Sequence, residues 1–370
     1  MNQVSREMRN EAVQNYSLPG TLIEERPYGS GHINETFLLT FDVEGEKVNV
    51  ILQRMNTEIF TKPEELMENI LGVTSYLREK IIANGGNPDR ETLNVIKTAE
   101  GKPFYVDSEN NYWRAYKFIT DATSYDAVES PDDFYQSAVS FGNFQRLLAD
   151  YPAETLHETI KGFHDTRARF SVFKQAVADD VKGRAKHVQK EIDFVLAHED
   201  IANCFCELLD KGELPLRVTH NDTKLNNIMI DNETRKGICV IDLDTVMPGL
   251  AMNDFGDSIR FGASTAAEDE TDLDKVWCDM ELFDLYAKGF IEGCGGKLTK
   301  KEIELMPMGA KTMTFECGMR FLTDYLQGDT YFRIHRENHN LDRCRTQFKL
   351  VADMEKKWDT MNDIVAKYNQ

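Results

Sequence analysis

The chain has 370 residues, with 43 lysines and arginines against 63 aspartates and glutamates, which gives a formal net charge of −20. Its hydrophobic fraction of 41% is ordinary for a globular enzyme, and its length is enough to bury two domain-sized cores. The acidic balance argues against a nucleic-acid or membrane-surface partner, because both present phosphates that demand basic patches. A cationic substrate is left open and is not favoured.

The cysteines and the N-terminus bear on the compartment. The seven cysteines are odd in number and scattered, and Cys204-Phe205-Cys206 is too tightly spaced for a usual zinc pair. We therefore expect reduced, mostly buried thiols. Residues 1–7 contain no apolar signal core, and no apolar run reaches the length of a membrane span. The expected location is cytoplasmic, with no membrane partner.

The first third of the chain is predicted to be a mixed β region with one helix. Apolar residues alternate over 36–43, as in a half-buried strand, and further strands are expected over 48–53 and 112–119. A helix should begin at Pro63, because proline suits a first turn and two glutamates follow it near the positive end of the helix.

A glycine-rich loop, Gly29-Ser30-Gly31, lies between strand-like segments of this region. Glycine permits positive φ and a close approach of backbone N–H groups to phosphate. A plain hairpin turn is an equal alternative for the loop taken alone, whereas a dinucleotide-binding turn is disfavoured because a strand follows instead of a helix. Together with the downstream motif described below, Gly29 and Gly31 are predicted to cover the phosphates of a nucleotide.

Gln53 stands where protein kinases carry a phosphate-binding lysine. By strand alternation Gln53 and Arg54 face opposite sides. Two alternatives stay open: Arg54 substitutes through a twist of the strand, or the metal and backbone amides suffice. We expect Gln53 to contact phosphate by hydrogen bonding. Tyr116, Phe118 and Ile119 are expected to form the hinge whose backbone receives adenine.

From Pro131 onward the chain is predicted to be mostly helical. Long helical patterns recur over 187–210, 272–292, 301–327 and 342–368. A small β-rich N-terminal lobe, residues 1–118, joined to a larger and mostly helical C-terminal lobe, residues 119–370, is the architecture of protein kinases. We therefore predict an α+β fold of the bilobal, protein-kinase-like class, with the nucleotide between the lobes.

The most informative segment begins at Asp222, which Asn227 follows by five residues. Asp242 comes after two short apolar runs, 228–230 and 238–241, that a turn-like stretch separates. A hairpin here would bring Asn227 and Asp242 together. A carboxamide and a carboxylate suit Mg²⁺ on nucleotide phosphates, while Asp222 should meet the hydroxyl of an acceptor. The sequence thus predicts a small-molecule kinase that uses ATP and Mg²⁺.

The neighbours of this set are assigned supporting roles. Each member alone could be an ordinary loop residue, so the prediction rests on the ordered set. His220 is expected to order the loop through hydrogen bonds. Asp254-Phe255-Gly256 spells the metal tripeptide of protein kinases, but it does not end a hairpin strand. We therefore expect Asp254 and Asp257 to support the catalytic loop by hydrogen bonds and Asp242 to be the metal ligand.

These motifs resemble the aminoglycoside phosphotransferase and choline kinase superfamily, where His-x-Asp-x-x-x-x-Asn precedes Ile-Asp-x-Asp/Glu. Within it, the chain is similar to the N-acetylhexosamine 1-kinase family over roughly residues 17–355. The runs that carry the similarity are 28–34, 51–56, 113–119, 217–227, 241–248, 254–265 and 316–326. The resemblance implies that ATP phosphorylates the anomeric hydroxyl of N-acetylglucosamine or N-acetylgalactosamine, so the partners would be a sugar and a nucleotide.

The resemblance also implies roles for single residues. Asp222 would be the catalytic base, with Asn227 and Asp242 as the Mg²⁺ ligands, and the lack of a lysine at the Gln53 position is shared with the family. The residues that match sugar contacts are His32, Phe261, Arg320 and Tyr331.

For Arg320 and Phe261 the sequence suggests more than a sugar contact. A buried Arg320 would be costly without a partner, so a polar ligand or an acid, Glu316 or Asp324, should meet it. The alternative for Phe261 is simple core packing.

Two other functions remain open. A kinase for an amine or alcohol, such as choline, homoserine or an aminoglycoside, would need acids or aromatic side chains grouped near the acceptor, and Glu268-Asp269-Glu270 is the candidate run. A nucleotide-binding pseudokinase would be expected to lack Asp222, Asn227 or Asp242, yet all three are present.

Overall fold

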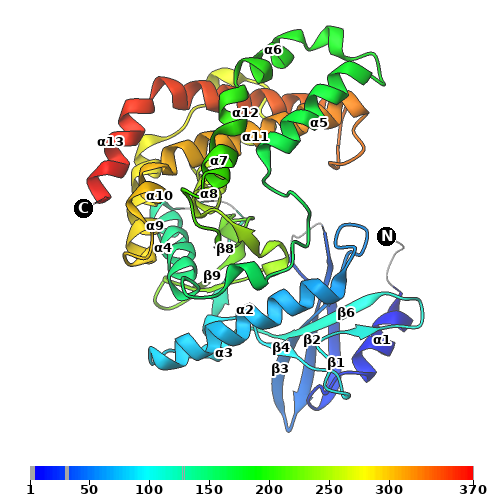
Figure 1. Cartoon of the computed structure of the whole chain (residues 1–370). Coiled ribbons are helices and arrows are strands. Elements are labelled where there is room, and N and C mark those ends of the chain that lie inside the picture. The colour runs from blue at the N-terminus through cyan, green and yellow to red at the C-terminus, as the bar shows by residue number, and fades with distance from the viewer. Residues whose placement is uncertain (1–4, 30–32, 127, 129, 370) are drawn as a thin grey trace. The chain divides into compact units, whose positions relative to one another are not determined.

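The computed structural model describes residues 5–29, 33–126, 128 and 130–369, shown with their secondary structure in Figure 1. The chain forms two compact units, each assembled from discontinuous segments. Unit 1 consists of Met1–Asp126, Asp150–Lys161 and Ile228–Met247, and unit 2 consists of Ala127–Ala149, Gly162–Asn227 and Pro248–Gln370. The lobes expected from the sequence, 1–118 and 119–370, are continuous segments, and the boundary between them stays a prediction.

An antiparallel sheet forms the main core of unit 1, with its strands in the order β1-β2-β3-β6-β4 and with β5 paired to β6. The strands are β1 (Thr21–Pro27), β2 (Glu35–Val43), β3 (Glu46–Arg54), β4 (Val95–Ile96), β5 (Tyr105–Val106) and β6 (Tyr112–Lys117). The three strands expected from the sequence are thereby confirmed, although the third ends at Lys117. Helix α1 (Arg6–Gln14) lies beside this sheet in Figure 1, and it buries Met8 and Ala12 in the core that they share.

The other elements of unit 1 follow the sequence signals closely. Helix α2 (Pro63–Ala83) begins at the predicted proline, and the short helix α3 (Pro88–Glu91) comes after it. A second sheet has the order β10-β9-β7 and contains β7 (Ala122–Thr123), β9 (Ile228–Asp231) and β10 (Gly237–Val240). Strands β9 and β10 are antiparallel, so the predicted hairpin is confirmed.

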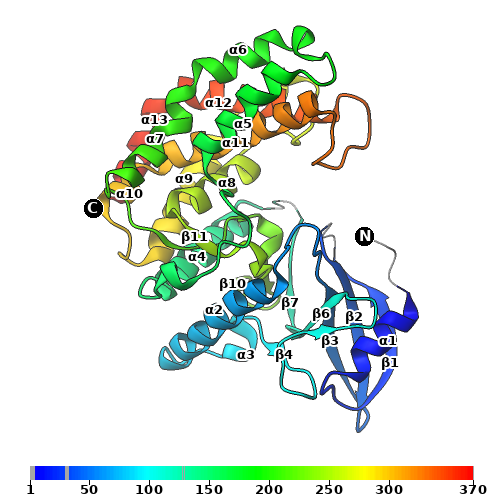
Figure 2. The ribbon, with the colours of Figure 1, turned by 45° about the vertical axis from the view of Figure 1, so that its right-hand side comes forward.

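Unit 2 is mostly helical. Its helices are α4 (Pro131–Leu147), α5 (Thr166–Asp179), α6 (Gln189–Ala197), α7 (Glu199–Asp210), α8 (Ala251–Gly262), α9 (Met280–Cys294), α10 (Lys300–Glu304), α11 (Met306–Gln327), α12 (His339–Lys356) and α13 (Trp358–Tyr368). Helices α5, α6, α7, α11 and α12 share one hydrophobic core and lie together in Figure 2. Two short strands, β8 (Arg217–Thr219) and β11 (Met247–Gly249), form a small sheet.

The long helical patterns of the sequence are interrupted in the structure. Three of them are divided into two helices by a single residue, at His198, Leu305 and Lys357. The pattern over 272–292 becomes an α-helix only at Met280. Apolar spacing continues across such breaks because both helices of a pair bury a face, so periodicity alone does not reveal where the axis changes direction.

Helix α8 approaches α11 closely at two glycines. A Cβ at Gly256 would lie 2.3 Å from the carbonyl oxygen of Gly309, and a Cβ at Gly309 would lie 2.3 Å from the carbonyl oxygen of Met252. Larger residues would therefore push the helices apart. This close packing positions α8, which carries Asp254 and Asp257.

Within the part of the chain that the structure describes, no helix combines the length and the apolar composition that crossing a bilayer requires.

Candidate active site

The loop that is expected to carry the base, residues 220–224, lies in unit 2 between β8 and a 3₁₀ turn, η3 (Leu225–Asn227), and is called the catalytic loop below. Asn221 in this loop has a φ of 64°, in the left-handed region that non-glycine residues seldom adopt. Its side-chain amide stabilises the turn, because Asn221 Oδ1 accepts from the Thr219 hydroxyl at 3.0 Å and Nδ2 donates to the Thr219 carbonyl at 3.3 Å. The next residue, Asp222, keeps its carboxylate partly exposed, with 29% of the side chain accessible.

Helix α8 holds the loop from beneath through the carboxylate of Asp254. Its two oxygens accept from the backbone N–H groups of His220 at 2.9 Å and Asn221 at 2.8 Å. A third donor is the Gln145 amide, at 2.8 Å. Complete burial raises the pKa of Asp254, and these hydrogen bonds oppose that shift. The expected supporting role of Asp254 is confirmed.

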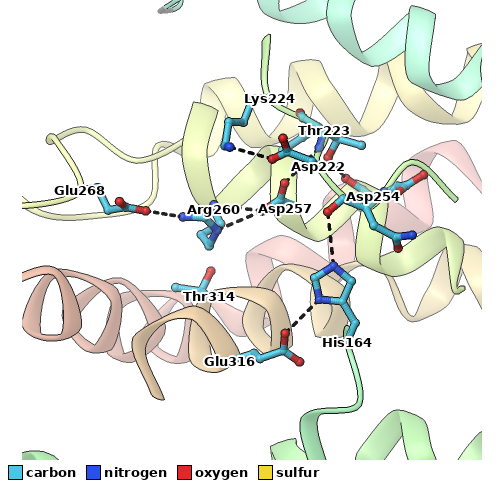
Figure 3. Close-up of polar contacts among 12 residues, drawn as sticks. His164, Asp222, Thr223, Lys224, Asp254, Asp257, Arg260, Glu268, Thr314 and Glu316 are labelled. Atoms are coloured by element: carbon cyan, nitrogen blue, oxygen red, sulfur yellow. Dashed lines mark hydrogen bonds and ion pairs between the residues drawn. The ribbon is translucent and has the colours of Figure 1, made fainter. Parts of the chain in front are cut away.

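Asp257, one helical turn later, holds the other half of the loop. Its carboxylate accepts from the backbone N–H of Thr223 at 3.0 Å and pairs with Arg260 at 3.0 Å. Burial opposes ionisation of Asp257, but the nearby positive charges of Arg260 and Lys224 outweigh burial and lower its pKa. Arg260 is shared with Glu268 at 2.8 Å, and Figure 3 shows this chain of charges beside the loop. The supporting role expected for Asp257 is also confirmed.

Asp222 is held at both carboxylate oxygens. Lys224 Nζ lies 2.7 Å from Oδ1, an ion pair drawn in Figure 3. Asn227 Nδ2 lies 3.2 Å from Oδ2 and also donates to the Asp222 carbonyl oxygen at 2.7 Å. Burial lowers the pKa of Lys224, but Asp222 and Asp257 outweigh it, so the net shift is upward and the ammonium stays charged. No role was expected for Lys224 from the sequence, although it stands two residues after the expected base.

His220 is packed as an internal support. It is completely buried, and its ring makes edge contacts with Phe141 and Phe144 at centroid distances of 5.4 and 6.1 Å. Its Nδ1 accepts from the backbone N–H of Asp222 at 3.3 Å. A side chain enclosed in this way orders the loop, as the sequence analysis expected.

A second support, not foreseen from the sequence, comes from His164 and Glu316. His164 Nδ1 lies 2.9 Å from Glu316 Oε1, and His164 Nε2 lies 3.4 Å from the carbonyl oxygen of Asn221. Thr166 donates to the other Glu316 oxygen at 2.6 Å. Burial disfavours the charged form of Glu316, but His164 and this hydrogen bonding outweigh it and lower the pKa. No spacing rule links residues 164 and 316, so only the fold could bring them together.

In unit 1, Asp244, which follows strand β10, forms an ion pair with Arg114. Arg114 on β6 binds Asp244 through two hydrogen bonds of 2.5 and 2.9 Å, and it donates from Nε to Gln53 Oε1 at 3.0 Å. Gln53 and Arg114 are cross-strand partners. The signal in the sequence that could have identified Arg114 is a charged residue between the apolar residues Trp113 and Ala115 of a strand. Arg54 faces the opposite side of the strand, is buried and pairs with Glu35. This ion pair disfavours the alternative in which Arg54 replaces the phosphate-binding lysine.

The remaining nucleotide residues were predicted from the sequence, and their roles stay predictions. Gly29 has a φ of 80°, the conformation for which glycine is suited. Tyr116 is buried in β6, whereas Phe118 and Ile119 follow the end of that strand, as a hinge requires. Gly31, and His32 of the sugar set, lie outside the described residues.

The surroundings of Arg320 differ from the expectation. Its guanidinium lies 5.4–5.6 Å from the centroids of three aromatic rings, and it donates to the Tyr331 hydroxyl at 3.3 Å. Neither expected acid pairs with it: Glu316 is taken by His164, and Asp324 accepts backbone N–H groups of residues 330–332. No acid is needed there because the side chain is only partly buried and aromatic faces attract the cation. The other alternative, a polar ligand, stays a prediction.

Phe261 lies near the end of α8, and 38% of it is exposed. That exposure is too high for a residue whose only role is core packing. A contact with a ligand remains the prediction for Phe261.

Asn227 and Asp242 have the chemistry that Mg²⁺ requires. The hairpin register pairs Ile228 with Val240, so Asn227, one residue earlier, and Asp242, two residues later, flank the same end of the hairpin. The Asn227 amide nitrogen is engaged by Asp222, which orients the amide and leaves its oxygen for a cation. Among the described residues no cluster of three or more His, Cys, Asp or Glu could hold a metal. Two protein ligands are still enough where phosphates and water complete the shell.

Comparisons with known proteins agree with these features. A family model described as "Phosphotransferase enzyme family" matches residues 24–282, which is more than half of the chain. A microcompartment-associated aminopropanol kinase is similar in structure, with a TM-score of 0.57, 13% identity, and coverage of 97% of this chain and 99% of that one. An aminoglycoside phosphotransferase from Alicyclobacillus acidocaldarius gives a TM-score of 0.58 at 10% identity, covering 100% and 97%.

A choline kinase from Cryptosporidium parvum is also similar, with a TM-score of 0.55, 13% identity, and coverage of 94% and 93%. At such low identity these structures show a shared fold only. The expected α+β, kinase-like fold class is thereby confirmed.

The Glu316 support leads to a prediction about pH. Because the folded pKa of Glu316 is lowered, its ionisation stabilises the fold above its ordinary pKa of 4.5, and this contribution is lost as the pH falls through the lowered value. Glu316→Gln should therefore reduce the free energy of unfolding by about 1.5–3 kcal/mol at pH 7. In urea titrations the difference from wild type should stay constant above about pH 5.5 and shrink as the pH falls below 4.5 towards the lowered value. The exposed control Glu337→Gln should remain close to wild type, and a pH-independent difference for Glu316→Gln would contradict the assignment.

Proposed function

We propose that the acceptor of this enzyme is an N-acetylhexosamine. The chain belongs to the phosphotransferase enzyme family. It is therefore a small-molecule kinase that uses a nucleoside triphosphate and Mg²⁺. The anomeric hydroxyl of N-acetylglucosamine or N-acetylgalactosamine would receive the γ-phosphoryl group of ATP. The observation that carries this proposal is the cluster around Arg320, where a guanidinium and the Tyr331 hydroxyl stand among aromatic rings. Aromatic faces can cover the apolar side of a sugar ring while the polar groups bind its hydroxyls.

The alternative acceptor, an amine such as choline, fits the charges less well. An ammonium group is bound by acids that are not already neutralised, or by aromatic faces that no other cation occupies. In the candidate run Glu268-Asp269-Glu270, Glu268 pairs with Arg260 and Arg343, and Asp269 pairs with Arg336. Arg320 would add a like charge to any such acceptor. These contacts favour a neutral, hydroxyl-rich acceptor.

The chemistry would be direct, in-line transfer. Asp222 accepts the hydrogen bond of the acceptor hydroxyl and takes its proton late in the reaction. The hydroxyl oxygen forms a bond to the γ-phosphorus, and the bond from that phosphorus to the β–γ bridging oxygen breaks, releasing ADP. An anomeric hydroxyl is more acidic than an ordinary alcohol, so base catalysis contributes modestly and electrostatic stabilisation contributes most.

The other residues would bind and orient the reactants. When bound, Mg²⁺ would neutralise charge on the phosphate oxygens, and we propose Asn227 and Asp242 as its protein ligands. Asp254, His220 and Asn221 fix the loop that aims Asp222. The sugar would meet Arg320, Tyr331 and Phe261, with His32 as a further proposed contact. A pseudokinase is disfavoured because Asp222, Asn227 and Asp242 are all present.

The acceptor position gives the sharpest prediction. With ATP and Mg²⁺, the protein should convert N-acetylglucosamine or N-acetylgalactosamine to a 1-phosphate, identified by phosphorus coupling to the anomeric proton in NMR. The methyl glycoside of N-acetylglucosamine is the matched control, because its anomeric oxygen carries no proton and should accept no phosphate. A 6-phosphate, or a phosphorylated methyl glycoside, would overturn the proposed position. Activity only on choline or an aminoglycoside would overturn the acceptor class and leave the kinase assignment intact.

The base assignment is tested by Asp222→Asn. This substitution removes the proton acceptor but keeps the size of the side chain, so folding and nucleotide binding should be retained. The turnover number should fall by about 10²–10⁴-fold, the usual contribution of a positioned base. Steady-state kinetics measure the loss, and thermal melting checks the fold. Near-normal turnover in a well-folded variant would exclude Asp222 as the base.

The choice of metal ligand is tested by comparing two carboxylates. Asp242→Ala should abolish Mg²⁺-dependent activity and leave the melting temperature close to wild type. Asp254→Ala should instead lower the melting temperature, because it leaves the buried backbone N–H groups of the catalytic loop unpaired. Metal titration and thermal melting of both variants separate these effects. A metal defect confined to Asp254→Ala would show that the roles are reversed.

A further inference from the structure

Two arginines of unit 2 contact the same residue, Phe163, from different helices. Arg169, on α5, donates from Nη2 to the Phe163 carbonyl oxygen at 3.3 Å, and the guanidinium of Arg320, on α11, lies 5.6 Å from the centroid of the Phe163 ring. We propose that Arg169 and Arg320 form an anion-binding subsite for the acceptor, which recognises a carboxylate or phosphate group carried by the sugar ring.

This subsite rests on the N-acetylhexosamine acceptor proposed above and extends it. A neutral ring would remain an acceptor, and an acid group on the side of the ring remote from the anomeric carbon would increase its affinity. The anomeric hydroxyl would still meet Asp222, so the transfer of the phosphoryl group is unchanged.

Neither arginine is neutralised by an acid of the described part of the chain. Arg169 and Arg320 form no ion pair there, although Asp165, Glu316 and Asp324 each stand four residues from one of them, a spacing at which an acid can pair along a helix. Each of these acids is already used: Asp165 accepts the N–H that caps α5, Glu316 binds a histidine, and Asp324 accepts the N–H groups of residues 330–332. Two positive charges therefore remain available to a ligand.

Arg169 is placed at a cost to the fold. Its Nε is buried and has no hydrogen-bond partner among the described residues. Burial lowers the pKa of Arg169, and the positive charge of Arg320 lowers it further. An unmade hydrogen bond and a like charge both destabilise the folded state. A bound anion would offset the repulsion, because it would neutralise both guanidinium groups.

The two arginines lie near the base through a short series of contacts. Glu316, one helical turn before Arg320, lies 2.9 Å from His164 Nδ1, as Figure 3 shows. His164 Nε2 in turn lies 3.4 Å from the carbonyl oxygen of Asn221, the residue before Asp222. One helical turn rises about 5.4 Å. A sugar whose anomeric hydroxyl meets Asp222 would therefore extend its far side towards the arginines.

The charge of the whole chain makes these local cations necessary for binding an acid. A net charge of −20 opposes the approach of an anion, but charges farther than about 8 Å are largely screened at physiological ionic strength. The groups within that distance decide the preference. Two guanidinium groups there favour an acid and repel an ammonium group.

Two other roles for Arg169 lead to different results. If Arg169 only supports the fold, its removal should lower the melting temperature and leave ligand preference unchanged. If it only donates hydrogen bonds to neutral hydroxyls, its removal should weaken acidic and neutral acceptors equally. An anion subsite predicts that removal relieves the repulsion from Arg320 and abolishes the preference for the acid.

The experiment compares Arg169→Met with wild type by isothermal titration calorimetry, thermal melting and steady-state kinetics. The ligands are N-acetylglucosamine carrying a carboxylate in place of the C6 hydroxymethyl group, and N-acetylglucosamine carrying a carboxymethyl ether at O3. Their methyl esters keep the size and remove the charge. Inorganic phosphate is titrated separately as a free anion. Arg167→Met is the matched control, because Arg167 lies on the same helix and pairs with Asp210 at 2.9 Å.

We expect wild type to bind at least one of the acids about 10- to 100-fold more tightly than its methyl ester, the contribution of a charged hydrogen bond. In Arg169→Met this ratio should fall to near 1, and the melting temperature should equal or exceed that of wild type. The kinetic defect should appear as a raised KM for the acid, because the acid group lies away from the reacting oxygen. Arg167→Met should keep the ratio of wild type.

Equal binding of acid and ester by wild type at both positions would overturn the subsite and leave the N-acetylhexosamine acceptor intact. An unchanged ratio in Arg169→Met, with a lowered melting temperature, would also overturn it and assign Arg169 a structural role. Phosphate binding that depends on Arg169, without a preference for either acid, would overturn it in favour of a separate small anion. If wild type binds none of the sugars, charged or neutral, the acceptor proposal fails and the subsite fails with it.

Discussion

The candidate active site depends on the buried carboxylate of Asp254, which binds the backbone of the loop 220–224. A sharply turned loop cannot satisfy its own backbone N–H groups, and Asp254 accepts those of His220 and Asn221. Complete burial works against the charged form and raises the pKa of Asp254, so the arrangement persists because three donors compensate. The close approach of α8 to α11 at Gly256 keeps this carboxylate buried below the loop. The aim of Asp222 follows from these constraints.

The cationic side chains of the molecule differ in whether buried acids already neutralise them. Arg114 is bound by Asp244, and Arg260 is bound by Asp257 and Glu268. Such buried pairs hold strands and helices in register and have little charge left for a ligand. Lys224 differs because its partner is the expected base itself, and Arg320 differs because aromatic rings surround it. Arg320 is the side chain that we propose to meet the acceptor.

The acceptor has to be argued from side chains, since one fold serves many acceptors. The similar structures include proteins named as an aminopropanol kinase, an aminoglycoside phosphotransferase and a choline kinase, all at low identity. In this chain the acids of the run 268–270 are already paired with cations, whereas Arg320 offers donors beside exposed aromatic surface. This polarity suits hydroxyl groups and opposes an ammonium group.

The sequence by itself determined the elements with strong local signals. These include the β9–β10 hairpin flanked by Asn227 and Asp242, the helix that begins at Pro63, and the supporting roles of Asp254 and Asp257. Each depends on residues close in the chain, or on a motif whose spacing reflects backbone geometry. Only the tertiary structure decided which distant charges meet. Residues 164 and 316 share no periodicity. For Arg320 the sequence left a polar ligand or an acid open, and the fold uses both candidate acids elsewhere, because the partner of a long side chain is set by packing between helices far apart in sequence.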